Sequence, residues 1–190
     1  MGRTKPLFDE ILVVDLEATC WDGDISIKPE GAQNEIIEVG LSSLDIHTGK
    51  ITQAPLMLVR PTQSTVSEFC TELTTWTQDD VKSGMILTAA CEKLRKDYKS
   101  KRRMWASWGN YDRRQFEREC SRKTVSYPFG PSHLNVKDLF ALQKRLTQQV
   151  DVMTAMEMIG LEFDGTWHVG RDDAFNIARV LRHLLGFDND

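Results

Sequence analysis

Short apolar runs alternate with amphipathic stretches along most of this chain. Residues 10–15 form a run rich in Val and Ile that is too short for a helix, which indicates a buried central strand. A second run covers 35–44, a hairpin turn is expected at 47–50, and a third run covers 51–59 and ends before Pro61. The pattern therefore predicts three strands in an antiparallel meander.

The rest of the chain alternates helices with short strands. Helical spacing is clearest where Leu87, Cys91, Leu94 and Tyr98 recur on one stripe. The predicted helices cover 67–73, 77–83, 87–98, 111–121, 138–147, 152–159 and 172–185, and further strands cover 104–108 and 134–136. Antiparallel strands followed by this alternation indicate an α/β protein, with a mixed central sheet flanked by helices in the order of a ribonuclease H-like fold.

Length and composition predict a single domain over 1–190. The chain is 41% hydrophobic and 27% charged, which suits a globular core and argues against disorder or a fibre. No run approaches the roughly 18 apolar residues needed to span a bilayer. The first residues, MGRTKP, contain neither an apolar signal region nor a myristoylation pattern. We therefore expect a cytoplasmic protein without a membrane partner. The four cysteines lack any Cys-x-x-Cys spacing, which favours reduced thiols over zinc ligands.

Positive charge is concentrated in one part of an acidic chain. The formal net charge is −4, which taken alone argues against a bulk electrostatic grip on nucleic acid. Half of the 24 Lys and Arg residues nevertheless fall between Lys93 and Lys123. Two interpretations stay open for this stretch. It can form solvated helix faces, or it can form a basic rim that holds a phosphate backbone.

Two acids follow the first apolar run. Side chains alternate along a strand, so Asp15 and Glu17 are expected on one face of it. Paired carboxylates at the end of a buried strand cost free energy unless something compensates their charge. The alternative is a surface turn, in which the same Asp-x-Glu sequence would have no chemical role.

Two further acids open predicted helices. Asp112 shares its face with Phe116 and Cys120, and Asn110 can cap that helix in its place. Asp173 shares its face with three apolar residues, Ile177, Leu181 and Leu184, while Asp172 can serve as the cap. Both acids are therefore expected to point inward. His168 precedes Asp173 by five residues, in a short loop bounded by glycines.

Together these residues contain the parts for phosphodiester hydrolysis. Hard cations such as Mg²⁺ prefer oxygen ligands, and are often held by carboxylates together with substrate phosphate. Two such ions can activate a water and neutralise charge at phosphorus. A histidine with a pKa near neutrality can take the proton from the attacking water.

At these positions the chain resembles the DEDDh exonucleases. Asp15 and Glu17 match the first motif, Asp112 the second, and His168 with Asp173 the third. The resemblance is closest to the branch of histone-mRNA and enhancer-of-RNAi 3′-exonucleases. It extends to DLEATCWDG at 15–23, NEIIEVG at 34–40, SEFCTELT at 67–74 and HVGRDDAFNIARV at 168–180, so that it covers about 11–186.

The resemblance implies a 3′→5′ exonuclease that releases nucleoside 5′-monophosphates. It implies two Mg²⁺ ions, replaceable by Mn²⁺, on Asp15, Glu17, Asp112 and Asp173. His168 would be the general base, with Glu17 sharing that role. The terminal base would stack between Phe69 and Tyr111, while Ala18 and Thr19 would contact the terminal nucleotide through their backbones.

The chain departs from the family pattern near the substrate. Leu73-Thr74-Thr75-Trp76 stands where the family often has Leu-Thr-Gly-Ile, and Tyr111 replaces a tryptophan. We expect single-stranded RNA or short 3′ overhangs as substrate. The alternatives are DNA or short oligonucleotides, because the contacts that would read the 2′-hydroxyl are not visible in the sequence. A binding module without catalysis on the same fold is the third interpretation.

Overall fold

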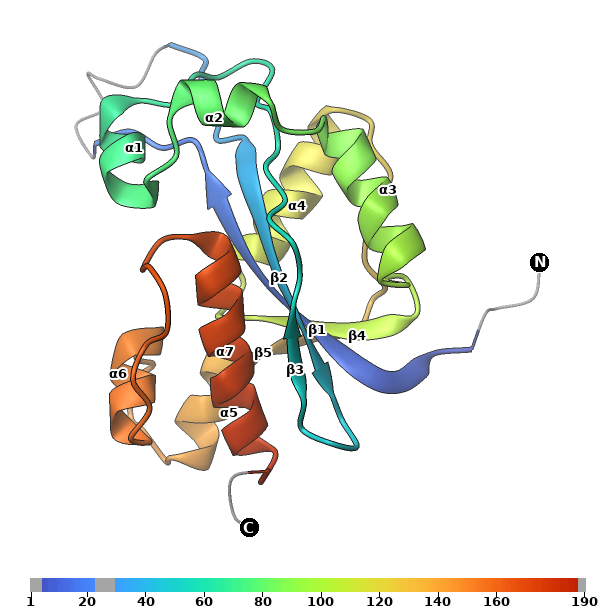
Figure 1. Ribbon diagram of the computed structural model, residues 1–190, viewed down its shortest axis with the longest axis vertical. Helices are drawn as coiled ribbons and strands as arrows, with labels where there is room; N and C mark the ends of the chain where they lie inside the picture. The colour runs from blue at the N-terminus through green and yellow to red at the C-terminus, as the bar shows by residue number, and fades with distance from the viewer. Residues whose placement is uncertain (1–4, 23–29, 188–190) are drawn as a thin grey trace.

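A five-stranded mixed sheet forms the centre of the computed structural model, which describes residues 5–22 and 30–187 (Figure 1). The strands are β1 (Leu7–Ala18), β2 (Ile36–Asp45), β3 (Ile51–Gln53), β4 (Arg103–Ser107) and β5 (His133–Asn135). Their order is β3-β2-β1-β4-β5, with β1 to β3 antiparallel and β4 and β5 joined in parallel. The α/β class and the antiparallel meander are confirmed. The ends of the expected 1–190 domain and Gly23 of the first motif lie outside the described residues.

The described residues form seven helices, five of which cover the two faces of this sheet. The seven are α1 (Glu68–Thr74), α2 (Gln78–Lys82), α3 (Leu87–Asp97), α4 (Tyr111–Arg122), α5 (Val136–Gln143), α6 (Val152–Met158) and α7 (Gly170–Leu184). Figure 1 shows α3 and α4 on one side of the sheet and α5, α6 and α7 on the other, while α1 and α2 lie beyond the ends of β1 and β2. None of these helices is long and apolar enough to cross a bilayer. All four cysteines are free thiols, as the sequence predicts, and three of them are buried.

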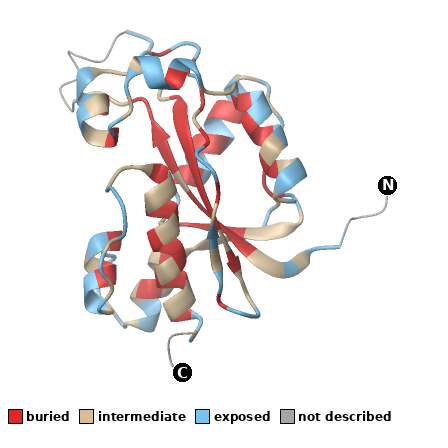
Figure 2. Ribbon diagram, in the orientation of Figure 1, coloured by how far each residue is buried: buried red, intermediate tan, exposed pale blue. Residues whose placement is uncertain are grey.

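Most of the central strand β1 is buried (Figure 2), and its side chains divide between two cores. Leu12 and Val14 belong to the cluster that contains α3 and α4, while Ile11 and Val13 belong to the cluster that contains α5 to α7. Because side chains alternate, the row that begins with Ile11 and Val13 continues with Asp15 and then Glu17. The apolar face that packs on α7 thus turns acidic at the end of the strand.

Two glycines let α7 lie directly against the sheet. Gly40 pairs with Asp15 across the β1–β2 ladder. A Cβ atom added to Gly40 would lie 1.8 Å from the carbonyl oxygen of Gly170, the first residue of α7. Only a residue without a side chain permits this approach. The start of α7, which carries Asp173, therefore lies directly against the backbone of β2 and of β1, the strand that carries Asp15 and Glu17.

Two predicted elements end earlier than the sequence pattern suggests. The third strand, expected over 51–59, stops at Gln53, although the chain still bonds β2 through the N–H of Ala54 and that of Val59. Pro55 interrupts the ladder because proline has no N–H to donate. The helix expected over 138–147 is α5, Val136–Gln143, which ends four residues earlier than expected. It also begins two residues earlier, because the side chain of Asn135 caps it.

Candidate active site

Three carboxylates converge where β1 ends. Asp15 and Glu17 leave the strand on the face that α7 covers, and Asp173 lies in the first turn of α7. One carboxylate oxygen of each residue lies within 4.8 Å of those of the other two. The structure thus brings together three of the four acids that the sequence indicates as metal ligands.

Asp112 lies beside this cluster and is fixed to the backbone of β1. Its side chain is buried, and its Oδ1 accepts a hydrogen bond of 3.0 Å from the N–H of Leu16. Phe116 and Cys120 are buried on the same helix face, as expected. Asn110 occupies the N-cap position of α4 but its side chain makes no capping bond, so that part of the prediction is wrong.

A cavity of about 340 Å³ opens over the carboxylates. All four acids line it, together with His168, Ala18 and Tyr111. The other two positions expected to contact substrate, Thr19 and Phe69, are not among its lining residues. Phe69 is exposed on α1, and Tyr111 is exposed at the start of α4. The cavity therefore gathers seven of the nine candidate residues.

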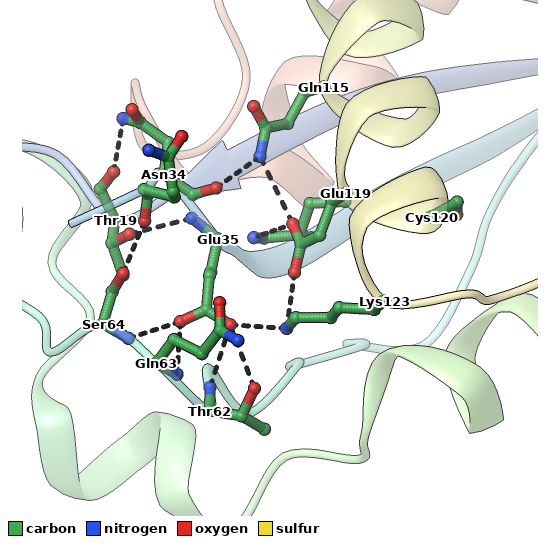
Figure 3. A network of polar contacts seen from close by, with 12 residues as sticks. Thr19, Asn34, Glu35, Thr62, Gln63, Ser64, Gln115, Glu119, Cys120 and Lys123 are labelled. Carbon is green, nitrogen blue, oxygen red and sulfur yellow. Dashed lines mark hydrogen bonds and ion pairs between the residues drawn. The ribbon is translucent and has the colours of Figure 1, made fainter. Parts of the chain in front are cut away.

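Thr19 is fully buried and is held by a polar network (Figure 3). Its hydroxyl accepts a bond of 2.9 Å from the N–H of Glu35, and its own N–H donates to the carbonyl of Glu35. The Glu35 carboxylate receives the N–H groups of Thr62 and Gln63 and pairs with Lys123. These bonds lower the pKa of Glu35 to about 2, against the effect of its burial. The network fixes the chain just after Ala18.

His168 is placed on the cavity by a left-handed backbone conformation with φ of 61°. Such a conformation is uncommon outside glycine and often occurs at functional sites. The ring lies edge-on to Trp167, with centroids 5.0 Å apart, and burial lowers the pKa of the imidazole. A ring that is neutral at pH 7 can accept a proton from water.

Ionisation of the four clustered carboxylic acids is unfavourable in free energy, which their raised pKa values express. Burial and repulsion from Asp173 and Glu38 raise the pKa of Glu17 to about 9, and burial raises that of Asp173 to about 7. Burial and the charges of Asp112 and Asp173 also raise the pKa of Asp15, and burial raises that of Asp112 to about 6. Within the described part of the chain, no Lys or Arg forms an ion pair with any of these acids.

The donor set fits a divalent cation. Oδ2 of Asp173 is buried and makes no hydrogen bond to any described residue. A buried carboxylate oxygen without a partner costs free energy, which a cation bound between the three acids would offset. Oxygen ligands alone are the preference of Mg²⁺ and similar hard ions.

Glu38 is a fifth acid next to the cluster, and the sequence analysis does not single it out. It is opposite Glu17 in the β1–β2 ladder and fully buried. Its two oxygens accept the N–H groups of Gly170 at 2.9 Å and Arg171 at 2.8 Å, so the carboxylate ties β2 to the first turn of α7. Burial raises the pKa of Glu38 in spite of these donors. The sequence signal that could have identified Glu38 is its position between apolar residues in the strand sequence IIEVG.

The departure from the family pattern at 73–76 has a visible consequence at Glu38. Thr75 keeps a left-handed backbone with φ of 67° at the end of α1, a conformation that favours glycine. The next residue, Trp76, donates its indole N–H to Glu38 Oε2 at 2.7 Å. The loop thus retains the shape expected for a glycine, and its tryptophan adds a donor that isoleucine lacks.

Asp173 faces the cluster, as predicted, but Asp172 does not cap the helix. The N-cap position of α7 is Val169, which makes no side-chain capping bond. The Asp172 carboxylate instead accepts the N–H of Thr166 at 2.9 Å and an amide hydrogen of Gln53 at 3.3 Å. The two neighbouring acids therefore point to different partners, and only one reaches the cavity.

The raised pKa values predict that metal binding stabilises the protein more as the pH rises. Without metal, the cluster's contribution to stability is fully present below the ordinary carboxyl pKa of about 4, where both acids are protonated in the folded and the unfolded chain. It falls as the pH rises from there, and the loss is complete above about 7 for Asp173 and above about 9 for Glu17. Metal binds only after these protons leave. We expect a Mg²⁺ concentration of about 100 times the Kd at pH 9 to raise Tm by roughly 5–10 °C at pH 9. The same Mg²⁺ concentration should raise Tm by much less at pH 6, where the Kd is higher.

Thermal unfolding with Mg²⁺ and with chelator at each pH measures this effect. The difference between the two samples at one pH cancels contributions from histidines and thiols elsewhere. A Tm shift of the same size at pH 6 and pH 9 would contradict the assignment of these carboxylates as ligands.

A mixed sheet with carboxylates and a histidine gathered at the end of its central strand defines the class of DEDDh exonucleases with a ribonuclease H-like fold. The comparison with protein families agrees, because the RNase_T model, described as "Exonuclease", matches residues 12–181. The chain belongs to this exonuclease family.

Individual relatives are similar to this chain along nearly its whole length. It is 30% identical over 188 residues to 3′-5′ exoribonuclease 1 of Rattus norvegicus, which covers 94% of this chain and 53% of the relative. The nuclease domain of 3′hExo, a DEDDh family member bound to rAMP, superimposes with a TM-score of 0.84 at 28% identity, over 96% of this chain and 94% of that one. A 3′-exonuclease that recognises the 3′ end of a histone mRNA stem-loop gives 0.84 at 27%, over 97% and 65%. The chain spans about half the length of the first curated relatives it matches.

Proposed function

We propose that this protein is a metal-dependent 3′→5′ exonuclease that acts on single-stranded RNA or short 3′ overhangs and releases nucleoside 5′-monophosphates. The observation that carries the proposal is the convergence of Asp15, Glu17 and Asp173 within 4.8 Å, in a cavity that His168 also lines. RNA is favoured because the relative from rat is an exoribonuclease and the 3′hExo domain holds rAMP.

In this proposal the acids hold two Mg²⁺ ions, for which Mn²⁺ can substitute. Asp15, Glu17, Asp112 and Asp173 supply the oxygen ligands. When bound, such ions neutralise charge on the phosphate and make a water molecule more nucleophilic. His168 accepts the proton of the attacking water, and Glu17 can share that task from its place in the cluster. The polypeptide contributes chiefly the fixed positions of these groups, set by β1, α4 and α7.

The terminal nucleotide is proposed to lie over the end of β1. Ala18 lines the cavity, and Thr19 follows it in a segment that the polar network around Glu35 holds in place. Phe69 and Tyr111 present exposed rings from α1 and α4. Stacking on such rings contributes about 1–3 kcal/mol per base and tolerates any base. This arrangement would bind any 3′ end and leave sequence unread.

Oligonucleotides labelled at one end or the other test the proposal directly. With Mg²⁺, RNA labelled at the 3′ end is expected to release a labelled mononucleotide at once, while RNA labelled at the 5′ end shortens step by step. Chelator should stop both reactions, and Mn²⁺ should restore them. Parallel DNA strands measure the sugar preference.

Internal cleavage, shortening from the 5′ end or hydrolysis that persists in chelator would each contradict the proposed function. Faster hydrolysis of DNA than of RNA would overturn the substrate preference and leave the reaction in place.

A further inference from the structure

A second hollow, of about 430 Å³, lies beside the catalytic cavity. Trp108, Tyr111 and Lys137 line both spaces, so the two hollows adjoin one another. Beyond these shared residues the hollow is lined by Arg114 and Arg118 of α4. We call this second hollow the α4 groove. It begins where the terminal nucleotide would lie and leads away from the acids.

The α4 groove carries positive charge that no described carboxylate neutralises. Arg114, Arg118 and Lys137 form no ion pair within residues 5–22 and 30–187. Their neighbour Arg113, on the same helix, is held by Glu117 at 2.9 Å. Lys137 is also the one Lys or Arg among the described residues that line the catalytic cavity. The three cations that line the groove are thus all without an ion pair among the described residues.

The basic stretch noted in the sequence thus divides into two groups. Five of its members form ion pairs with acids: Lys93 with Asp97, Lys96 with Glu92, Arg103 with Asp9, Arg113 with Glu117, and Lys123 with Glu35. Lys101 and Arg102 line a different hollow, with Lys5 and Gly130. Arg114 and Arg118 are the members that reach the α4 groove.

The guanidinium of Arg118 is held in place without losing its charge. It donates to Oε1 of Gln115 at 2.7 Å, a neutral acceptor. Gln115 is buried and donates in turn to the carbonyl of Asn34 at 2.9 Å, as Figure 3 shows. At the other side of the groove, the side-chain amides of Asn135 and Gln149 bond the acid Asp138. A preset cation loses less conformational freedom when it binds an anion.

We propose that the α4 groove binds the phosphate backbone of the nucleotides that precede the terminal one. The inference rests on the proposed function, since it assumes a 3′ end in the catalytic cavity. Lys137 would contact the phosphate nearest the scissile bond, and Arg114 and Arg118, one helical turn apart, the phosphates beyond it. A basic groove beside exposed aromatic rings is how proteins hold single strands without reading sequence.

The double variant Arg114→Gln/Arg118→Gln tests the groove, with Arg113→Gln as the matched control from the same helix. For a ten-nucleotide RNA, we expect KM to rise about tenfold with kcat unchanged. For a dinucleotide, which does not reach the groove, KM should stay the same. The slope of log KM against log salt should decrease by about 0.7 for each phosphate that the variant no longer neutralises. Arg113→Gln should match the parent in all three measurements.

Fluorescence anisotropy in chelator, with the same RNA labelled at its 5′ end, separates this inference from the proposed function. Suppose that the parent protein hydrolyses nothing, and that the double variant loses affinity for the RNA while Arg113→Gln does not. That result would refute the proposed function and support the binding role of the groove. Equal affinity of parent and double variant would overturn the groove, as would an equal rise of KM for the dinucleotide. A blunt duplex that binds as tightly as the single strand, with the same loss of affinity in the variant, would overturn the single-strand assignment.

Discussion

Asp15→Asn and Asp173→Asn are each expected to lower hydrolysis by at least about 10³-fold while the protein stays folded. Each change removes a charged ligand from a set whose oxygens lie within 4.8 Å. Charge stabilisation by bound metal contributes several kcal/mol to the transition state, and each 1.36 kcal/mol is tenfold in rate. In chelator, the variants should unfold at a higher temperature than the parent, because the remaining carboxylates repel one another less.

The neighbour of one of these acids provides the matched control. Asp172→Asn changes the same side chain in the same helical turn, but Asp172 bonds Thr166 and Gln53 and does not line the cavity. We expect Asp172→Asn to retain most of the activity. Steady-state hydrolysis of labelled RNA and thermal unfolding with and without Mg²⁺ measure both effects. A folded, fully active Asp173→Asn would refute the metal site.

His168→Ala is expected to reduce kcat by about 10²–10⁴-fold, the usual loss for a general base. Metal binding should persist, seen as an unchanged Tm rise with Mg²⁺, because the imidazole is not one of the converging oxygen ligands. With Mg²⁺ saturating at every pH, so that the carboxylates are held deprotonated, the parent's rate should fall at acid pH as the ring takes up a proton. Burial lowers the pKa of His168, so this fall should lie below the ordinary value of about 6.5.

The pH profile distinguishes a base from a residue that only shapes the cavity. In the variant, the acid limb assigned to His168 should disappear, and added imidazole should restore part of the rate. His47→Ala, at the turn between β2 and β3, serves as the control and should match the parent. An acid limb that remains unchanged in His168→Ala would remove this histidine from the mechanism.

The sequence predicts the central strand and the inward acids because each rests on a local periodicity. Alternation along β1 places Asp15 and Glu17 on one face, and the helical repeat from Asp173 through Ile177 and Leu181 places that acid inward. The expected cap at Asp172 is wrong although the inward direction of Asp173 is right. Helix faces are fixed by the burial of several residues together, whereas a cap depends on one side chain with competing partners.

Contacts between segments that are far apart in the sequence could not be predicted from the periodicity of apolar residues. Glu38 meets α7 across 132 positions of the chain, and its bonds to Gly170 and Arg171 depend on the close seating of that helix. Lys137 comes to the catalytic cavity from the start of α5, which follows the parallel strand β5. No local pattern marks Lys137 as part of the site, and for Glu38 the one signal was its position between apolar residues of a strand. The stacking roles of Phe69 and Tyr111 stay predictions.

The backbone contact between Gly40 and Gly170 has a consequence for the interpretation of natural variation. Neither residue carries chemistry, yet any side chain at Gly40 would have to displace the start of α7, and with it Asp173. A missense change there would leave every acid and the histidine intact in the sequence and still separate them in space. A screen of natural variants that checked only the four acids and the histidine would miss this change, which should be weighed with changes to the acids themselves.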